Sequence, residues 1–533
     1  MNLSPHKRAF IAGTMILTAT GFLSRILGFF YRIFLSRAIG AEGLGIYNMV
    51  HPIFGICFAL CAGSIQTAIS RFVAAEVGKG RNVFRTGLVI SLSMSLALTA
   101  VIWNGADFLA ARVLLEPRCA PLLPMMALAV PCSAVHACIN GYYYGLRKTK
   151  VPAFTQLMEQ AVRIGAVFLV ADIMVEKGIP ITVQLAVFGH LIGEAASTLF
   201  SMVAFSLFPP DGIQPSAGPE PRCAGYTADD TGQSSPLSGF RSFAAGFRSA
   251  APALMALALP LMGNRLVLNL LSSAEAILIP NRLLASGLSS SEAYSVYGVL
   301  TGMAMPFIFF PSAITNSMAV LLLPAVAEAQ SVGNRRRISS AVTMSLRYSL
   351  YMGIFCIGIF TRFGDDLGTG VFHDSSAGYF IATLSWLCPF LYLSTTTGSI
   401  LNGLGRTGTT FFQNVAALLL RLAFVAFGIP VFGITALLWG MLVSEILLSA
   451  MHLISLRRNV DFSWNAWSMI VKPAAILLLS CGLLAAVLSL PAAAILGQLH
   501  PFLAAAVKIG FLAVCYGGFL LLFHKKGGAE SLE

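Results

Sequence analysis

The chain has 533 residues, of which 57% are hydrophobic and 11% are charged, and its formal net charge is +12. Apolar segments of about 20 residues or more recur along its whole length, which excludes an ordinary soluble domain, and their continuity excludes a membrane β-barrel, whose strands alternate polar and apolar residues. The basic residues form small clusters between the apolar segments, which excludes a nucleic-acid-binding face. We therefore predict an all-α polytopic membrane protein.

Hydropathy predicts about fourteen membrane-spanning helices. They fall near residues 9–36, 45–75, 84–107, 120–146, 152–175, 180–208, 251–280, 294–327, 340–362, 378–403, 409–428, 431–456, 468–490 and 501–523. Alternate loops carry clusters of Lys and Arg, at residues 7–8, 79–85, 147–150, 335–337, 457–458 and 525–526. By the positive-inside rule, these loops and both chain termini are expected on the cytoplasmic side.

The first span carries a polar stripe along one side of the expected helix. Six small, polar or charged residues follow one another in steps of three or four: Thr14, Thr18, Gly21, Arg25, Gly28 and Arg32. This spacing places them on one helical face. An arginine at mid-bilayer costs roughly 2.5–3.5 kcal/mol, so such a face favours a water-filled cavity or a ligand. The alternative is that both arginines extend to the lipid headgroups.

Residues 209–247 interrupt the apolar pattern with prolines, glycines and serines, and we expect a flexible cytoplasmic linker there. The linker divides an N-lobe (1–208, spans 1–6) from a C-lobe (248–458, spans 7–12), and residues 459–533 supply spans 13–14 and a cytoplasmic tail. Similar residues recur in the same order in both lobes, as Tyr47 and Tyr297 or Glu194 and Glu445. Six spans precede the linker, so we predict two parallel six-helix repeats, an arrangement suited to alternating access.

The seventh span carries the second set of candidate substrate-binding residues. The repeat offset places Glu275 opposite Arg25 and Arg282 opposite Arg32. Arg265, Asn269 and Ser272 share a face of the same span. Arginine suits a pyrophosphate because its planar fork donates paired hydrogen bonds and stays charged. The alternative is that Glu275 and Arg265 belong to internal ion pairs that hold the lobe together.

Neutral polar residues in spans 2 and 8 are candidates for hydrogen bonds to a sugar or peptide headgroup. Gln66 and Thr67 lie in span 2, and Asn316 lies in its repeat counterpart. Polar contacts between the helices are the alternative interpretation. We also expect Glu159 and Arg163 to pair within one helix. Glu194 and Glu445 are further candidates, as sites that bind a proton or a sodium ion.

No catalytic constellation has the spacing that enzyme chemistry requires, so no enzyme activity and no cofactor are expected. The ten cysteines include one close pair, Cys57 and Cys61, without a histidine or carboxylate beside it, so no metal site is expected either.

Four segments resemble the stage V sporulation protein B group of polysaccharide transporters, within the superfamily that also contains the MATE drug exporters. They are LSRILGF at 23–29, GAEGLGIY at 40–47, AISRFV at 68–73 and IPNRL at 279–283. The resemblance implies a MATE-like fold in a bacterial cytoplasmic membrane and a flippase for undecaprenyl-pyrophosphate-linked glycans, with MurJ-type lipid II flippases as analogues. It also implies an essential arginine at Arg25. A second family arginine falls on Tyr31, one place before Arg32.

We therefore expect an anionic, lipid-linked glycan headgroup to be held by Arg25 and Arg265, with Arg32 and Arg282 as further candidates. Spans 13 and 14, by the same resemblance, form a groove for the lipid tail. Moving about two negative charges outward against 100 mV gains roughly 4–5 kcal/mol, so the potential favours export. Membrane lipids and envelope-synthesis enzymes are the expected partners, and one two-lobed chain suffices as a monomer. The alternatives are a cation-coupled multidrug exporter and a non-transporting scaffold for envelope synthesis.

Overall fold

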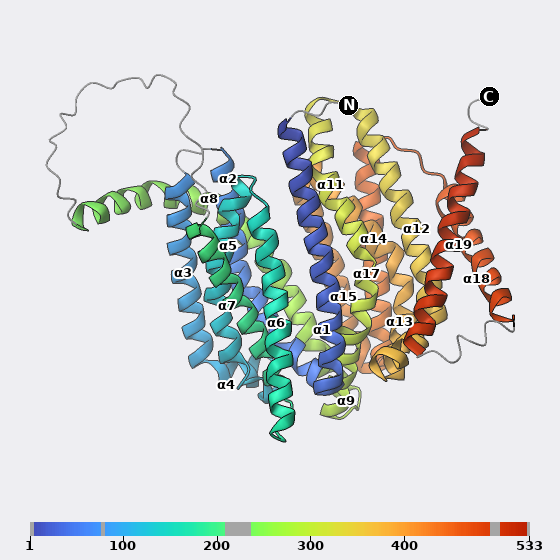
Figure 1. Ribbon diagram of the computed structural model, residues 1–533, viewed down its shortest axis with the longest axis horizontal. Helices are drawn as coiled ribbons and strands as arrows, with labels where there is room; N and C mark the ends of the chain where they lie inside the picture. The colour runs from blue at the N-terminus through green and yellow to red at the C-terminus, as the bar shows by residue number, and fades with distance from the viewer. Residues whose placement is uncertain (1–4, 76–79, 208–235, 491–500, 530–533) are drawn as a thin grey trace.

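The computed structural model describes residues 5–75, 80–207, 236–490 and 501–529, and these ranges form helices joined by short loops, with no strand (Figure 1). The first group of helices is α1 (Pro5–Phe58), α2 (Ser64–Ala75), α3 (Gly80–Asn104), α4 (Ala106–Phe108), α5 (Leu123–Gly145), α6 (Lys150–Glu176) and α7 (Val183–Leu207). The second is α8 (Pro236–Ala285), α9 (Ser290–Gly298), α10 (Met305–Phe309), α11 (Ser312–Ser331), α12 (Arg335–Leu367), α13 (Ser375–Leu384), α14 (Cys388–Gly403), α15 (Thr407–Ala423), α16 (Ile429–Phe432), α17 (Ile434–Asn459), α18 (Lys472–Leu488) and α19 (Pro501–Ala529). The predicted all-α membrane architecture is confirmed.

Twelve helical stretches of the described residues are long and apolar enough to cross a membrane. The first of them, Met15–Ala75, contains both of the first two predicted spans. The predicted fifth span corresponds to α6, which is not among the twelve. The number of fourteen spans therefore stays a prediction.

A glycine makes the bend that separates the first two spans. Gly40, inside α1, has φ 70° and ψ −179°, a conformation that L-residues with a side chain rarely adopt. Two helices therefore meet at a kink at Gly40, within the stretch labelled α1. As a result, the arginine stripe precedes the bend and the Tyr47 segment follows it.

The two lobes are separate helical groups in Figure 1. Helices α2, α3, α5, α6 and α7 pack together on one side, and α11, α12, α14, α15 and α17 pack together on the other, with α18 and α19 at the outer edge of the second group. Helix α1 packs on both α6 and α9, and α8 packs on α2, α3 and α15, so these two helices connect the lobes. The start of α1 and the end of α19 lie at the same end of the molecule (Figure 1).

Only part of the predicted linker lies within the described residues. Residues 209–235 lie outside the described residues. Helix α8 begins at Pro236, inside the predicted linker.

Candidate substrate cavity

A cavity of about 430 Å³ lies between α1 and the eighth predicted span. Arg25, Gly28 and Arg32 line it from α1, and Thr301 and Asn316 line it from the opposite lobe. The two arginines are seven residues apart, so they are on the same side of the helix and both contribute to this one cavity. The cavity is therefore formed jointly by the N-lobe and the C-lobe.

A local irregularity of the opposite helix gives Arg32 its partner. Residues Val299–Ala304 form a π-helical segment, η5, before α10. Within it, the backbone carbonyl of Thr301 accepts a hydrogen bond from Nη1 of Arg32 at 3.2 Å. The Thr301 hydroxyl accepts from Asn48 Nδ2 at 2.9 Å and donates to the carbonyl of Tyr297 at 2.6 Å. Segments of π-helix often occur at functional sites because they change the pattern of backbone bonds.

Neither arginine of this cavity has an acidic partner among the described residues. The ion pairs found there join other groups, and the lining of the cavity contains no Asp or Glu. A second cavity of about 190 Å³ continues along the α1 stripe past Thr18 and Gly21, and it shares Arg25 and Asn316 with the first. The space is thus positively charged and lacks an internal counter-ion.

Arg265 lies elsewhere, against α2 of the N-lobe. Its Nη2 donates to the Thr67 hydroxyl at 3.1 Å, and its backbone carbonyl accepts from Asn269 Nδ2 at 3.0 Å. A side chain at Gly63 would meet the Arg265 guanidinium at 2.2 Å, so this glycine leaves the space that the arginine fills. Arg265, Thr67 and Asn269 form one polar group, and none of them lines the cavity of Arg25.

Glu275 forms an ion pair inside the C-lobe, as the alternative interpretation of this residue expects. Its Oε2 lies 2.7 Å from Nη2 of Arg421 on α15, and both side chains are mostly buried. Arg421 and Ser272 line a third cavity of about 580 Å³ inside the C-lobe, together with Glu445. Gln66 and Arg282 are partly buried and line none of these three cavities.

Other buried charges pair within the N-lobe. Glu194 Oε2 accepts from the Ser133 hydroxyl at 2.7 Å and lies 2.8 Å from His136 Nε2. Arg163 pairs with Glu159 one turn earlier on α6, as the spacing predicts. These pairs lie within the N-lobe, and among the described residues Nδ1 of His136 and Nε of Arg163 stay without a hydrogen-bond partner.

Sequence reasoning missed the cross-lobe contacts of Thr301 and Arg37. Thr301 carries no signal in the sequence, because a π-helical segment follows from packing and not from residue type. Arg37 donates two hydrogen bonds, of 3.1 and 2.7 Å, to the carbonyl of Val371 in the C-lobe. Arg37 lies five residues after Arg32 and off the polar stripe. The sequence shows its charge but does not indicate that it contacts Val371.

The two-lobed helical arrangement defines a polytopic helical membrane protein with the MATE-like fold. The structure is similar to the lipid II flippase MurJ in an inward closed conformation, with a TM-score of 0.68 and 13% identity over 96% of this chain and 99% of that chain. It is also similar to an inward-facing multidrug resistance MATE family transporter, with a TM-score of 0.60 and 14% identity over 84% of this chain and 100% of that chain. At these identities the similarity concerns the fold.

The family follows from sequence. A model of the polysaccharide biosynthesis protein family matches residues 10–330, more than half of the chain, and the chain belongs to this family. Stage V sporulation protein B of Bacillus subtilis (strain 168) is a relative, 27% identical over 466 residues, which cover 86% of this chain and 85% of that protein. The resemblance inferred from the four segments is therefore confirmed.

Proposed function

We propose that this protein moves an anionic, lipid-linked glycan precursor of the undecaprenyl-pyrophosphate type across the cytoplasmic membrane by alternating access. One observation carries the proposal: Arg25 and Arg32 share a cavity between the lobes that contains no acidic side chain. Such a cavity attracts a diphosphate and repels a cation. The family of polysaccharide biosynthesis proteins and the fold shared with a lipid II flippase support a cargo of this kind.

A second, apolar space supports a cargo that carries a lipid tail. A groove of about 420 Å³ lies between α11, α12, α18 and α19, and aromatic residues such as Tyr351, Phe355 and Tyr516 line it. Helix α11 contributes Asn316 to the arginine cavity and Met318 to the groove, so it forms a wall between them. A headgroup and a tail on either side of one helix would suit an amphipathic molecule.

The direction of movement follows from charge. The cytoplasmic placement of the termini, from the positive-inside rule, puts the start of α1 and the arginine stripe on the loading side. About two negative charges gain roughly 4–5 kcal/mol when they move outward across 100 mV. The proposal therefore requires no bound ion to drive net export.

The test is a flipping assay in reconstituted vesicles with an undecaprenyl-pyrophosphate-linked disaccharide, at a defined potential. Arg25→Ala should lose most of the transport, about 10-fold or more if one charge-assisted pair is lost, while insertion stays normal. Arg25→Lys should recover part of it, because a point charge remains without the fork. Arg335→Ala, at the exposed start of α12, is the matched control and should leave transport unchanged.

Two other results would identify the alternatives. Unimpaired transport in Arg25→Ala would overturn the role of the arginine. A wild-type protein that confers broad resistance to cationic drugs and moves no lipid-linked glycan would favour a multidrug exporter.

A further inference from the structure

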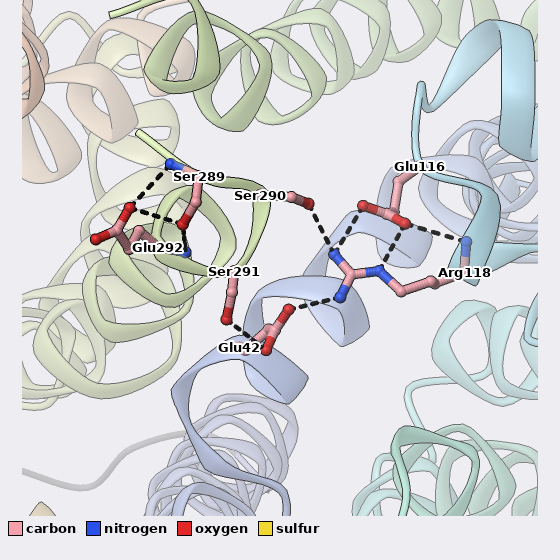
Figure 2. A network of polar contacts seen from close by, with 7 residues as sticks. All are labelled: Glu42, Glu116, Arg118, Ser289, Ser290, Ser291 and Glu292. Atoms are coloured by element: carbon pink, nitrogen blue, oxygen red, sulfur yellow. Dashed lines mark hydrogen bonds and ion pairs between the residues drawn. The ribbon is translucent and has the colours of Figure 1, made fainter. Parts of the chain in front are cut away.

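A dense polar network joins the lobes at the end of the molecule opposite the start of α1 (Figure 2). Arg118, in the short helix η4 (Pro117–Cys119), is its centre. Its guanidinium binds Glu116 at 2.8 and 3.0 Å and Glu42 of α1 at 2.5 Å. All three charges belong to the N-lobe, and Glu116 is 4% exposed.

The C-lobe meets this network with neutral groups only. Ser290 Oγ accepts from Arg118 Nη2 at 3.2 Å, and the Ser291 hydroxyl donates to Glu42 at 2.8 Å, both from the start of α9. The Arg118 guanidinium also lies 5.3 Å from the centre of the Tyr294 ring. Figure 2 shows Arg118 between Glu116 and Glu42, with Ser290 and Ser291 facing them from the start of α9.

The same rule holds for the other polar contacts between the lobes. Arg32 and Arg37, both on α1, donate to backbone carbonyls of the C-lobe. Among the described residues, every ion pair joins groups on the same side of the interface. Ion pairs therefore stay within one lobe, and each hydrogen bond found between the lobes has at least one neutral group.

Backbone packing makes the contact tight at this end. A side chain added at Gly45 would lie 2.1 Å from the carbonyl of Tyr294, and one added at Gly298 would lie 1.9 Å from the carbonyl of Ala41. The first turns after the Gly40 bend and helix α9 thus touch through their backbones. We call this backbone contact the seam. It closes the end of the molecule opposite the start of α1, which the proposed topology places outside the cell and which we call the outer end.

We propose that Arg118, Glu42 and Glu116 form a releasable clasp, which holds the outer end shut by binding Ser290, Ser291 and Tyr294 of the opposite lobe. When the seam opens, no charge of the clasp loses its ion-pair partner, because Arg118 stays bound to the carboxylates of Glu42 and Glu116. It breaks only bonds that water replaces readily, whereas an ion pair across the seam would leave two charges without partners. The clasp stabilises the closed outer end without preventing its release. This inference rests on the proposed alternating-access function.

The direct test measures how often the outer end opens. Met305 lines the arginine cavity, so a Met305→Cys variant in intact cells is labelled from outside by a membrane-impermeant maleimide only when the seam opens. Protein without this substitution is the blank for the native cysteines. Ser290→Ala combined with Ser291→Ala should raise the labelling rate roughly 10-fold. The double variant removes the hydrogen bond from Arg118 to Ser290 and the one from Ser291 to Glu42.

Ser289→Ala is the matched control. Ser289 caps α9 together with Glu292, and the side-chain hydrogen bonds found for it among the described residues stay within this cap, so its loss weakens the helix start alone and should leave labelling unchanged. Equal labelling of the double serine variant and wild type, or an equal increase in Ser289→Ala, would overturn the clasp. The labelling uses no cargo, so it decides the clasp even where the flipping assay rejects the proposed substrate.

A cross-link gives the converse test. A short bifunctional thiol reagent between Glu42→Cys and Ser291→Cys joins the two lobes and should abolish transport. The same reagent between Glu42→Cys and Arg118→Cys stays within the N-lobe and should leave the transport of that variant unchanged. Transport that survives the inter-lobe cross-link would show that the seam does not open.

Discussion

Each lobe buries a glutamate at a repeat-related position, but different groups contact the two carboxylates. In the N-lobe, Glu194 binds the hydroxyl of Ser133 and the imidazole of His136. In the C-lobe, Glu445 binds the hydroxyl of Ser394, and His452 directs Nδ1 at the backbone carbonyl of Ser394, 3.1 Å away. An imidazole thus contacts the carboxylate in the N-lobe, whereas in the C-lobe the imidazole contacts a backbone carbonyl.

The arginines of the repeat diverge in the same manner. Arg163 pairs with Glu159 inside α6, whereas Arg421 pairs with Glu275 and so joins α15 to α8. The two positions carry the same residue type and have different partners. In the N-lobe the charges hold one bundle together, and in the C-lobe they attach the helix that connects the two lobes.

The largest expected effect comes from removing Arg421. Arg421→Met leaves Glu275 buried without its partner and should lower the free energy of unfolding by about 3 kcal/mol. The double variant with Glu275→Met should recover most of that loss, because no uncompensated charge remains. Denaturant unfolding in detergent measures both. Arg337→Met is the control, since its pair with Glu328 is exposed and 3.8 Å long, and a cost for it equal to that of Arg421→Met would contradict the explanation.

A smaller effect separates the two histidines. His136→Asn removes a bond to a carboxylate and should cost about 2 kcal/mol, whereas His452→Asn, with its partners a carbonyl and a hydroxyl, should cost about 1 kcal/mol. The same unfolding measurement compares them. Equal losses would mean that Glu194 gains nothing from an imidazole that Glu445 lacks.

The fold follows from the sequence because its signals are strong and regular. Long apolar runs, a polar linker and repeated residues indicate an all-α chain with two lobes, and the similar structures confirm this class. The period of the first span also places Arg25 and Arg32 on one side of a helix, where both line the cavity. That they bind substrate stays a prediction.

The partners of these residues could not be derived in the same way. A repeat offset aligns Glu275 with Arg25 along the chain, but it does not state how α8 is rotated, and α8 directs Glu275 to Arg421. One residue changes direction by about 100° on a helix, so Tyr31 is buried towards Gly189 while the adjacent Arg32 lines the cavity. Rotation and π-helical segments depend on packing between distant helices, which spacing alone does not contain.

The smallest effect concerns the outer network, which differs from the buried clusters because it lies outside the membrane spans. Burial by itself would raise the pKa of Glu116, but hydrogen bonds from the side chain and backbone of Arg118 outweigh it and hold that pKa below its ordinary value. A carboxyl whose pKa is lower in the folded chain stabilises the fold above its unfolded pKa. That contribution is lost as the pH falls through the lower, folded value.

We therefore expect the melting temperature to decrease as the pH is lowered below about 4, and to decrease less steeply in Glu116→Gln. Glu176→Gln is the matched control, because Glu176 is exposed at the end of α6 and takes part in none of the ion pairs found among the described residues. Parallel curves for Glu116→Gln and wild type would show that Arg118 does not depend on Glu116 for its position. The charges of the clasp would then be held by Glu42 alone, and the seam would depend on α1 more than on the loop that carries Arg118.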